Sequence, residues 1–400
     1  MFTDIHSLAT NLVVIEGRHP TLLWEACDVP SIVVYRTSKT LYVLDTGVGP
    51  EQRGVLEAQM TSMGKGAGEI VLVNSHGHFD HLGNNDLLQK STISRKRHLI
   101  SKEAAPDSDI RAELFEMYGR GKEYFSYIEG LPLPADKISG LLGALGARSI
   151  APSTLEELGQ QLRQSGVLPA LNSFLPSIVV DILLATYPAV FPSPETMAFF
   201  EDVSAPETIE IAGTRWSGWK LGGPAPEVYV LRSGGHSKGG VVFYIPEHRF
   251  LMFADETSSV PLWPDSDPRR VMVTVKKALS MLDSGALDWL CAGHFPMVPS
   301  NDPQQVRASL LRIQGQFQQF SDAVEKECVT HAEGLTVDEL YESLRKNSSP
   351  PPYITFLMAN QFPVFTTFMK LTLLNHLLLY NFPSRKEPDG KVRFFVPGPK

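Results

Sequence analysis

The chain is poor in cysteine and has no excess of basic residues. Its 400 residues include only three cysteines, Cys27, Cys291 and Cys328, and no two of them have C-x-x-C spacing. Neither a disulfide framework nor a cysteine zinc site is therefore expected. Lysine and arginine total 36 against 44 aspartate and glutamate residues, which gives a net charge of −8. Nucleic acid is disfavoured as a partner, because phosphate backbones bind basic surfaces.

Signals for export, for a membrane span and for internal repeats are also lacking. The first residues have no basic stretch followed by a long apolar run, as a signal peptide would, so a cytoplasmic location is expected. The segment from Asn347 to Met369 carries no charge, but prolines such as Pro350 and Pro363 interrupt it. Buried helices are predicted there rather than a membrane span. A homodimer through these apolar C-terminal helices is a further expectation.

Strands and helices alternate in two parts of the chain. Apolar, β-branched runs between turn residues predict strands at residues 11–16, 31–35, 40–44, 69–74, 208–211, 214–220, 228–231, 241–245 and 250–253. Helical spacing of apolar positions predicts a helix at residues 54–63. This pattern indicates an α/β fold with one catalytic domain, formed by residues 1–90 and 206–300.

Two other segments are predicted to be helical. Residues 91–205 have apolar positions at helical spacing and are expected to form an insertion that acts as a lid or wall. The basic run at residues 95–98 is expected on a solvated face. Residues 301–400 are expected to form a helical extension packed on the core, with a first helix at residues 303–328. Thr336 and Glu339 then form a capping-box pattern at the start of a second helix.

Three histidines and an aspartate lie close together directly after the predicted strand at residues 69–74. The sequence there is Ser75-His76-Gly77-His78-Phe79-Asp80-His81. Alternate residues of an extended turn share a face, so His76 and His78 point to one side, and the following turn directs Asp80 and His81 to a neighbouring point. Imidazole and carboxylate are suitable ligands for zinc, iron and manganese. The motif therefore predicts a metal site and leaves the metal open.

Three later motifs each place a histidine or an aspartate after an apolar run. They are Ser233-Gly234-Gly235-His236, Leu251-Met252-Phe253-Ala254-Asp255 and Cys291-Ala292-Gly293-His294. Together with the first motif, and in this order, they resemble the metallo-β-lactamase superfamily. Two positions depart from the family pattern: Asn84 stands where many members have a second glycine, and Ala254 precedes the aspartate in place of glycine.

The resemblance implies a four-layer αββα sandwich with its active site at one edge, between two β-sheets. It also implies two divalent metal ions per chain, with zinc expected first and iron or manganese as alternatives. One ion would be held by His76, His78 and His236 and the other by Asp80, His81 and His294, with Asp255 bridging them. Asp45, in Leu44-Asp45-Thr46-Gly47, would orient a ligand imidazole. Lys238, beside His236, would contact an anionic group of the substrate.

This site predicts a metal-dependent hydrolase of small molecules. A solvent molecule that bridges two metal ions has a pKa near neutrality and can act as the nucleophile. Asp80 would orient this nucleophile or accept its proton. The expected substrate is a lactone, ester, thioester or amide, and the apolar tail and the helical insertion favour a bulky, hydrophobic one.

The sequence leaves several alternative functions open. Some members of the superfamily are persulfide dioxygenases with a single iron, which here would use His76, His236 and Asp255; metal content would distinguish them. A phosphodiesterase or nuclease is disfavoured by the net acidity, and a sulfatase stays open. A non-catalytic scaffold would have been expected to lose ligands. A diiron flavoprotein is disfavoured because no flavodoxin-like module follows residue 300.

Overall fold

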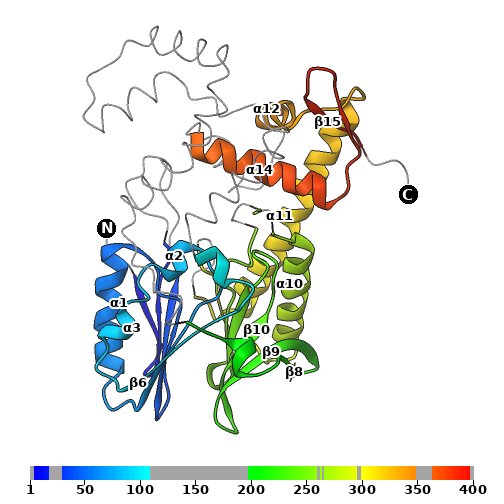
Figure 1. Ribbon diagram of the computed structural model, residues 1–400. Coiled ribbons are helices and arrows are strands. Elements are labelled where there is room, and N and C mark those ends of the chain that lie inside the picture. Colours follow the sequence, from blue (N-terminus) through cyan, green and yellow to red (C-terminus); the bar gives the residue numbers. More distant parts are fainter. Residues whose placement is uncertain are drawn as a thin grey trace, which may run out of the picture. The chain divides into compact units, whose positions relative to one another are not determined.

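Two compact units make up the chain, residues 1–113 with 184–319 and residues 114–183 with 320–400. The computed structural model describes residues 4–17, 29–108, 197–258, 262–263, 265–294, 299–347 and 363–396. Two β-sheets and their covering helices belong to the first unit (Figure 1). The helical runs predicted between residues 110 and 187 lie outside the described residues, so the lid or wall stays a prediction.

The first sheet has seven strands in chain order. They are β1 (Ile5–Ala9), β2 (Leu12–Ile15), β3 (Ile32–Arg36), β4 (Thr40–Leu44), β5 (Glu69–Val73), β6 (Arg95–Ile100) and β7 (Ala198–Phe199). The pairs from β1 to β4 are antiparallel, and those from β4 to β7 are parallel. The carboxyl ends of β4, β5 and β6 therefore lie at the same edge of the sheet.

The second sheet has six strands in the order β13-β12-β11-β10-β9-β8. They are β8 (Glu207–Ile211), β9 (Thr214–Gly222), β10 (Pro226–Arg232), β11 (Val241–Ile245), β12 (Phe250–Met252) and β13 (Trp289–Cys291). All pairs are antiparallel except β12 with β13. Strands β10, β12 and β13 therefore run in one direction and end at the same edge of this sheet.

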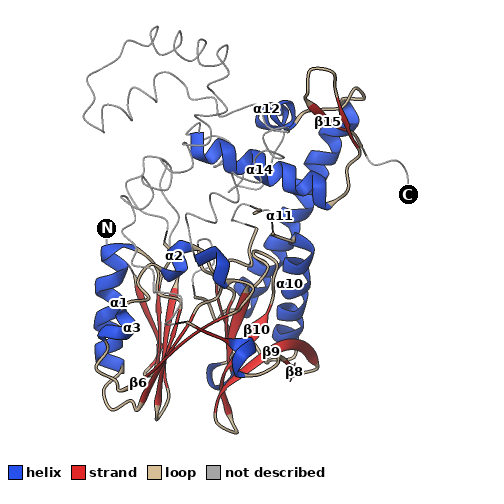
Figure 2. Ribbon diagram, viewed as in Figure 1, coloured by secondary structure: helices blue, strands red, loops and turns tan. Residues whose placement is uncertain are grey.

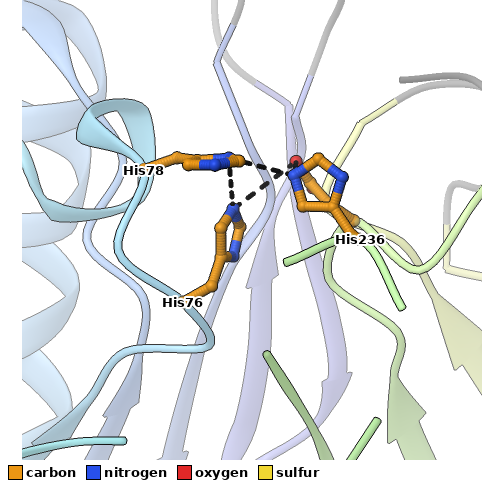
Figure 3. Close-up of side chains that lie close together, drawn as sticks. His76, His78 and His236 are labelled. Carbon is orange, nitrogen blue, oxygen red and sulfur yellow. Dashed lines mark hydrogen bonds and ion pairs between the residues drawn. The ribbon is translucent and has the colours of Figure 1, made fainter. Parts of the chain in front are cut away.

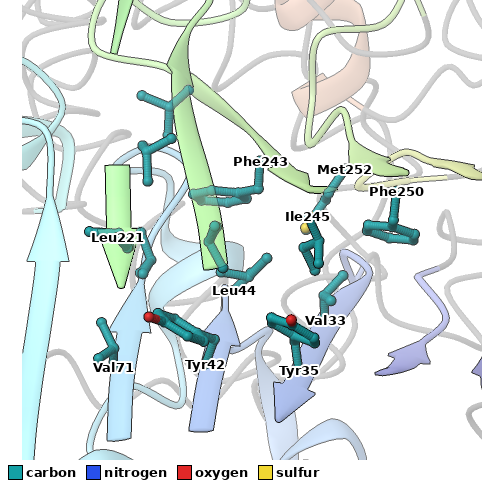
Figure 4. Packing of buried hydrophobic residues seen from close by; sticks show 14 of the residues in the cluster. Val33, Tyr35, Tyr42, Leu44, Val71, Leu221, Phe243, Ile245, Phe250 and Met252 are labelled. Atoms are coloured by element: carbon teal, nitrogen blue, oxygen red, sulfur yellow. The ribbon is translucent and has the colours of Figure 1, made fainter. Parts of the chain in front are cut away.

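The core between the two sheets follows from the alternation of side chains along each strand. In β3, Val33 and Tyr35 join the cluster between the sheets, whereas Val34 packs on the opposite face. In β11, Phe243 faces the first sheet and Tyr244 faces away from it. Figure 4 shows the aromatic and aliphatic side chains of both sheets in contact. Burial of this apolar surface is the main favourable contribution to folding of the unit.

Helices cover the outer faces of both sheets and complete the four layers (Figure 2). Helices α1 (Gly49–Met63) and α3 (Leu87–Lys90) pack on the first sheet, and α10 (Pro268–Asp283) and α11 (Pro303–Thr330) pack on the second. The short elements of this unit are α2 (Phe79–Leu82), α9 (Phe200–Val203) and two 3₁₀ turns, η1 (Ala105–Ser108) and η3 (Pro246–His248). The predicted αββα sandwich is confirmed.

The segment predicted as a helical insertion from residue 91 begins instead with a strand of the first sheet. Strand β6 pairs with β5 along residues 95–99, but only Leu99 and Ile100 pair with β7. The first half of β6 is thus a sheet edge, where charged side chains are tolerated. The side chain of Arg95 is 78% exposed there, and Arg97 Nε lies 2.9 Å from Glu69 Oε1. The sequence did not indicate this strand, because the basic residues at its start interrupt the apolar pattern and only residues 98–100 are buried.

The second unit is described by the end of α11 and by residues after it. These form α12 (Val337–Asn347), α14 (Pro363–Leu379) and a hairpin of β14 (Ser384–Lys386) and β15 (Val392–Phe394). The capping box is confirmed: Thr336 Oγ1 accepts the Glu339 N–H (3.2 Å), and the Glu339 carboxylate accepts the Thr336 N–H (2.9 Å). Leu373 and Leu377 of α14 are buried. In the described parts of the chain, no helix is both long and apolar enough to cross a bilayer.

Candidate metal centre

The loop after β5 carries the first four predicted ligands. His76, His78 and His81 are buried, and the side chain of Asp80 is 14% exposed. Between the first two histidines, a Cβ on Gly77 would lie 2.1 Å from the carbonyl oxygen of Ala104. Only glycine fits this close approach. The absence of a side chain at Gly77 therefore lets the backbone of the histidine loop approach residues 101–105 closely. His76 and His78, on either side of Gly77, belong to the same cluster of donors.

His236 lies in the loop between β10 and β11. This loop turns at Gly234, whose φ is +61°, a conformation that favours glycine. The N–H of Val241, where β11 begins, donates to the Ser75 carbonyl over 2.9 Å. This bond ties the His236 loop of the second sheet to the histidine loop of the first.

Asp255 and His294 follow the neighbouring strands β12 and β13. The N–H of Phe253 donates to Cys291, and that of Gly293 donates to Ala254, each over 2.7 Å. These bonds hold the two strand ends together beyond the last residues of the strands. Ala254 has a φ of +46°, so a side chain occupies the left-handed conformation where the family has glycine.

The structure brings His76, His78, His236 and Asp255 together in one cluster, which we call cluster 1. Nδ1 of His78 lies 3.0 Å from Nε2 of both His76 and His236 (Figure 3). Asp255 Oδ2 lies 3.8 Å from His76 Nε2 and 3.5 Å from His236 Nε2. All four side chains are buried. Cluster 1 thus joins donors from both sheets.

A second group, cluster 2, contains Asp80, His81, His294 and again Asp255. His294 Nε2 lies 3.1 Å from Asp80 Oδ2 and 3.5 Å from Asp255 Oδ2. His81 Nε2 lies 3.3 Å from Asp255 Oδ1 and 3.7 Å from Asp80 Oδ2. Asp255 is the member common to both clusters, as the predicted bridging position requires.

These donors fit divalent metal ions. Within each cluster the candidate ligand atoms all lie within 4.8 Å of one another, close enough to surround one ion. His81 Nε2 and Asp255 Oδ1 are buried and lie 3.3 Å from each other, but neither atom makes a well-formed hydrogen bond, which is costly unless another group satisfies them. Imidazole nitrogens and carboxylate oxygens are ligands for zinc, iron and manganese. The two clusters are therefore able to bind metal ions.

The protonation states in the two clusters differ. Burial lowers the pKa of His76 and His236 well below the usual histidine range, so both rings are neutral near pH 7. Burial also acts to lower the pKa of His81, but the carboxylates of Asp255, Asp80 and Asp45 outweigh it and raise that pKa. A metal ion in cluster 2 must displace the proton of His81, so its affinity falls on acidification.

Asp45 directly follows β4 and bonds to two residues of the histidine loop, Ser75 and His81. Its carboxylate accepts the N–H and the hydroxyl of Ser75, each over 2.7 Å, and its Oδ2 lies 2.8 Å from His81 Nδ1. This contact places the proton of the ring on Nδ1 and leaves Nε2 directed at cluster 2. The geometry suits the orienting role predicted for Asp45.

The side chain of Lys238 is not brought to either cluster by any contact seen in the described residues. Lys238 is exposed, and its backbone N–H donates to Asp265 Oδ2 over 2.8 Å. The predicted anion contact stays a prediction. The Trp263 ring lies near His78 of cluster 1 in a T-shaped arrangement, with ring centroids 5.3 Å apart.

Sequence reasoning missed Glu256, which the structure places beside cluster 1. Glu256 is buried and accepts the backbone N–H groups of Gly235 and His236. It directly follows Asp255 in the sequence, but no local pattern indicates its contact with the His236 loop.

Comparisons with known proteins agree with the fold. Residues 26–156 match the model of the metallo-beta-lactamase superfamily. A beta-lactamase domain protein from Burkholderia ambifaria is similar in structure, with a TM-score of 0.56 and 14% identity over 98% of this chain and 94% of that one. A metallo-beta-lactamase family protein from Thermus thermophilus has a TM-score of 0.50 and 19% identity over 98% of this chain and 100% of that one. Among curated proteins, none matches the sequence.

At 14% and 19% sequence identity, the similarity to these two solved structures supports the fold and nothing beyond it. The family match, by contrast, includes the whole histidine loop, and His236, Asp255 and His294 complete the two clusters. The chain is therefore a metallo-β-lactamase-fold protein that carries the sequence signature of that superfamily.

Proposed function

We propose that the protein is a dinuclear metal-dependent hydrolase that cleaves a carbonyl substrate such as a lactone, ester, thioester or amide. The observation that carries this proposal is the pair of donor clusters that share Asp255. A single-iron enzyme would need only His76, His236 and Asp255. The presence of Asp80, His81 and His294 in a second complete cluster favours the dinuclear centre.

The chain's own residues supply the remaining requirements of hydrolysis. Two divalent ions, zinc first among the candidates, would supply Lewis acidity and lower the pKa of bound water. Asp80 is the most exposed of the seven donor residues, and its Oδ2 faces His294 Nε2 at 3.1 Å. Its carboxylate can therefore hold or pass on a proton at the open side of cluster 2.

A bulky, hydrophobic substrate is part of the proposal. The indole of Trp263 lies against the His78 imidazole and offers an apolar surface beside cluster 1. Hydrolysis rates across a series of esters of increasing acyl length test this point. We expect kcat/KM to rise with the length of the acyl group. Equal values across the series would contradict a preference for hydrophobic substrates.

Location and assembly remain predictions within this proposal. Cys291 and Cys328 are free thiols, which is in keeping with a cytoplasmic protein. The homodimer expected through the apolar C-terminal helices can be checked by sedimentation of the purified chain.

The first experiment measures metal content and activity together. We expect about two metal ions per chain by plasma mass spectrometry, and loss of ester hydrolysis in Asp80→Ala and His236→Ala with unchanged far-UV circular dichroism. His331→Ala is the matched control, because this histidine bonds to the Glu327 carbonyl oxygen and belongs to neither cluster. One iron per chain with oxygen consumption would instead support the sulfur dioxygenase, and full hydrolysis in either variant would overturn the proposal.

A further inference from the structure

Glu256 connects the two ligand-bearing segments of the second sheet. It directly follows Asp255 in the loop after β12, is 2% exposed, and reaches across to the loop of His236. Its Oε1 accepts the N–H of Gly235 over 2.8 Å and the N–H of His236 over 3.1 Å. Hydrogen bonds from backbone N–H groups to a carboxylate are among the stronger ones in proteins, especially when buried.

The carbonyl groups of the same two residues are also held. The N–H of Asp267 donates to the Gly235 oxygen over 2.7 Å, and the Ser266 hydroxyl donates to the His236 oxygen. Both peptide groups that flank the His236 Cα are therefore fixed. The loop itself contains Gly234, Gly235, Gly239 and Gly240, so its backbone would have wide conformational freedom without these bonds.

We propose that Glu256 is a positioning residue for the metal ion of cluster 1. This inference rests on the proposed metal centre. Because Glu256 holds the backbone of His236 and is covalently next to Asp255, one carboxylate sets the spacing of two ligands whose Nε2 and Oδ2 atoms lie 3.5 Å apart. Groups that orient ligands in this way commonly contribute about 10–100-fold to metal affinity.

Three substitutions separate the hydrogen bonds from the bulk of the side chain. Glu256→Ala removes the acceptor, and Glu256→Asp keeps the charge but is one methylene too short to reach both N–H groups. Glu256→Gln keeps an acceptor oxygen of the same reach. Metal-depleted protein is titrated with zinc against a chromogenic chelator, and with cobalt to follow the visible spectrum of each bound ion.

We expect one of the two zinc affinities to fall by about 10–100-fold in Glu256→Ala and Glu256→Asp, with an altered cobalt spectrum. Glu256→Gln should stay within a few-fold of the parent. The matched control is Glu327→Ala, since Glu327 is 5% exposed, accepts the Ser343 hydroxyl and belongs to the second unit. It should lower the melting temperature and leave both affinities unchanged.

Each other result overturns the inference. If the parent binds two zinc ions and Glu256→Ala or Glu256→Asp binds them equally well, Glu256 has no positioning role and the metal centre stands. If Glu256→Gln is as weak as Glu256→Ala, or Glu327→Ala is equally weakened, the loss does not come from the two accepted N–H bonds. A parent chain that binds no zinc would remove the proposed function and this inference together.

Discussion

At the scale of the residue, Asp45 shows how one buried carboxylate can serve two neighbours. It satisfies the backbone and hydroxyl of Ser75 and holds His81 through Nδ1. We expect Asp45→Asn to fold, because asparagine tolerates the φ of +59° found there. The amide cannot accept from all three donors, so zinc affinity of cluster 2 should fall about 10–100-fold. Chelator competition measures it, and unchanged affinity would argue that His81 is oriented by packing alone.

His98 gives a residue-scale prediction for pH. It lies on β6, its Nε2 is 2.6 Å from Asn74 Oδ1, and burial lowers its pKa from 6.5 to about 4. The folded protein therefore keeps the ring neutral where the unfolded chain takes up a proton. Since the unfolded state binds more protons between these values, the free energy of unfolding falls as pH drops from about 6.5 to 4. The full effect of this one group is about 3 kcal/mol.

The measurement compares the parent with His98→Gln by urea unfolding at several pH values. Glutamine can donate to Asn74 and does not titrate, so its free energy of unfolding should depend less steeply on pH over this interval. Parallel curves for the two proteins would show that His98 is not the group responsible.

The seven donor residues could be located from the sequence because each follows an apolar run at a strand end. Their grouping came from resemblance to the superfamily, and the structure brings them into two clusters. Glu256 could not be predicted in the same way. Its role depends on the approach of two loops that are 20 residues apart, and no local pattern encodes that contact.

At the scale of the element, strands buried on both faces were the most predictable. Strands β2, β3, β4 and β11 are continuous apolar runs, because one face meets the other sheet and the opposite face meets a helix. Helix α10 was missed although Asp267 caps it and Pro268 occupies its first turn. Strand β6 was missed because its exposed half is basic.

The layer between the sheets gives an element-scale prediction. Phe243, in the middle of β11, is fully buried there, so Phe243→Ala should leave a cavity and lower the free energy of unfolding by about 3–5 kcal/mol. Val273→Ala on α10 is the control, because Val273 is 51% exposed and should change it by less than about 0.5 kcal/mol. The midpoints of urea unfolding measure the effect of each variant. Equal midpoints for Phe243→Ala and Val273→Ala would show that Phe243 is not part of the core.

At the scale of the whole first unit, the proposed ions would join the two sheets. Cluster 1 takes His76 and His78 from the first sheet and His236 and Asp255 from the second. Ligands that bind only the folded state stabilise it, by about 2.7 kcal/mol at a free concentration about 100 times the dissociation constant. Removal of metal by a chelator should therefore lower the melting temperature, and added zinc should restore it in a concentration-dependent way. A melting temperature unaffected by verified metal loss would contradict this.

Asp255 makes the centre vulnerable at a single position. Six of the seven donor residues belong to one cluster each, so their loss leaves the other cluster with its full set. Loss of Asp255 removes a donor from both at once. The two ions would accordingly load as an interdependent pair, and genetic variation at this codon would be tolerated less than at any other ligand codon.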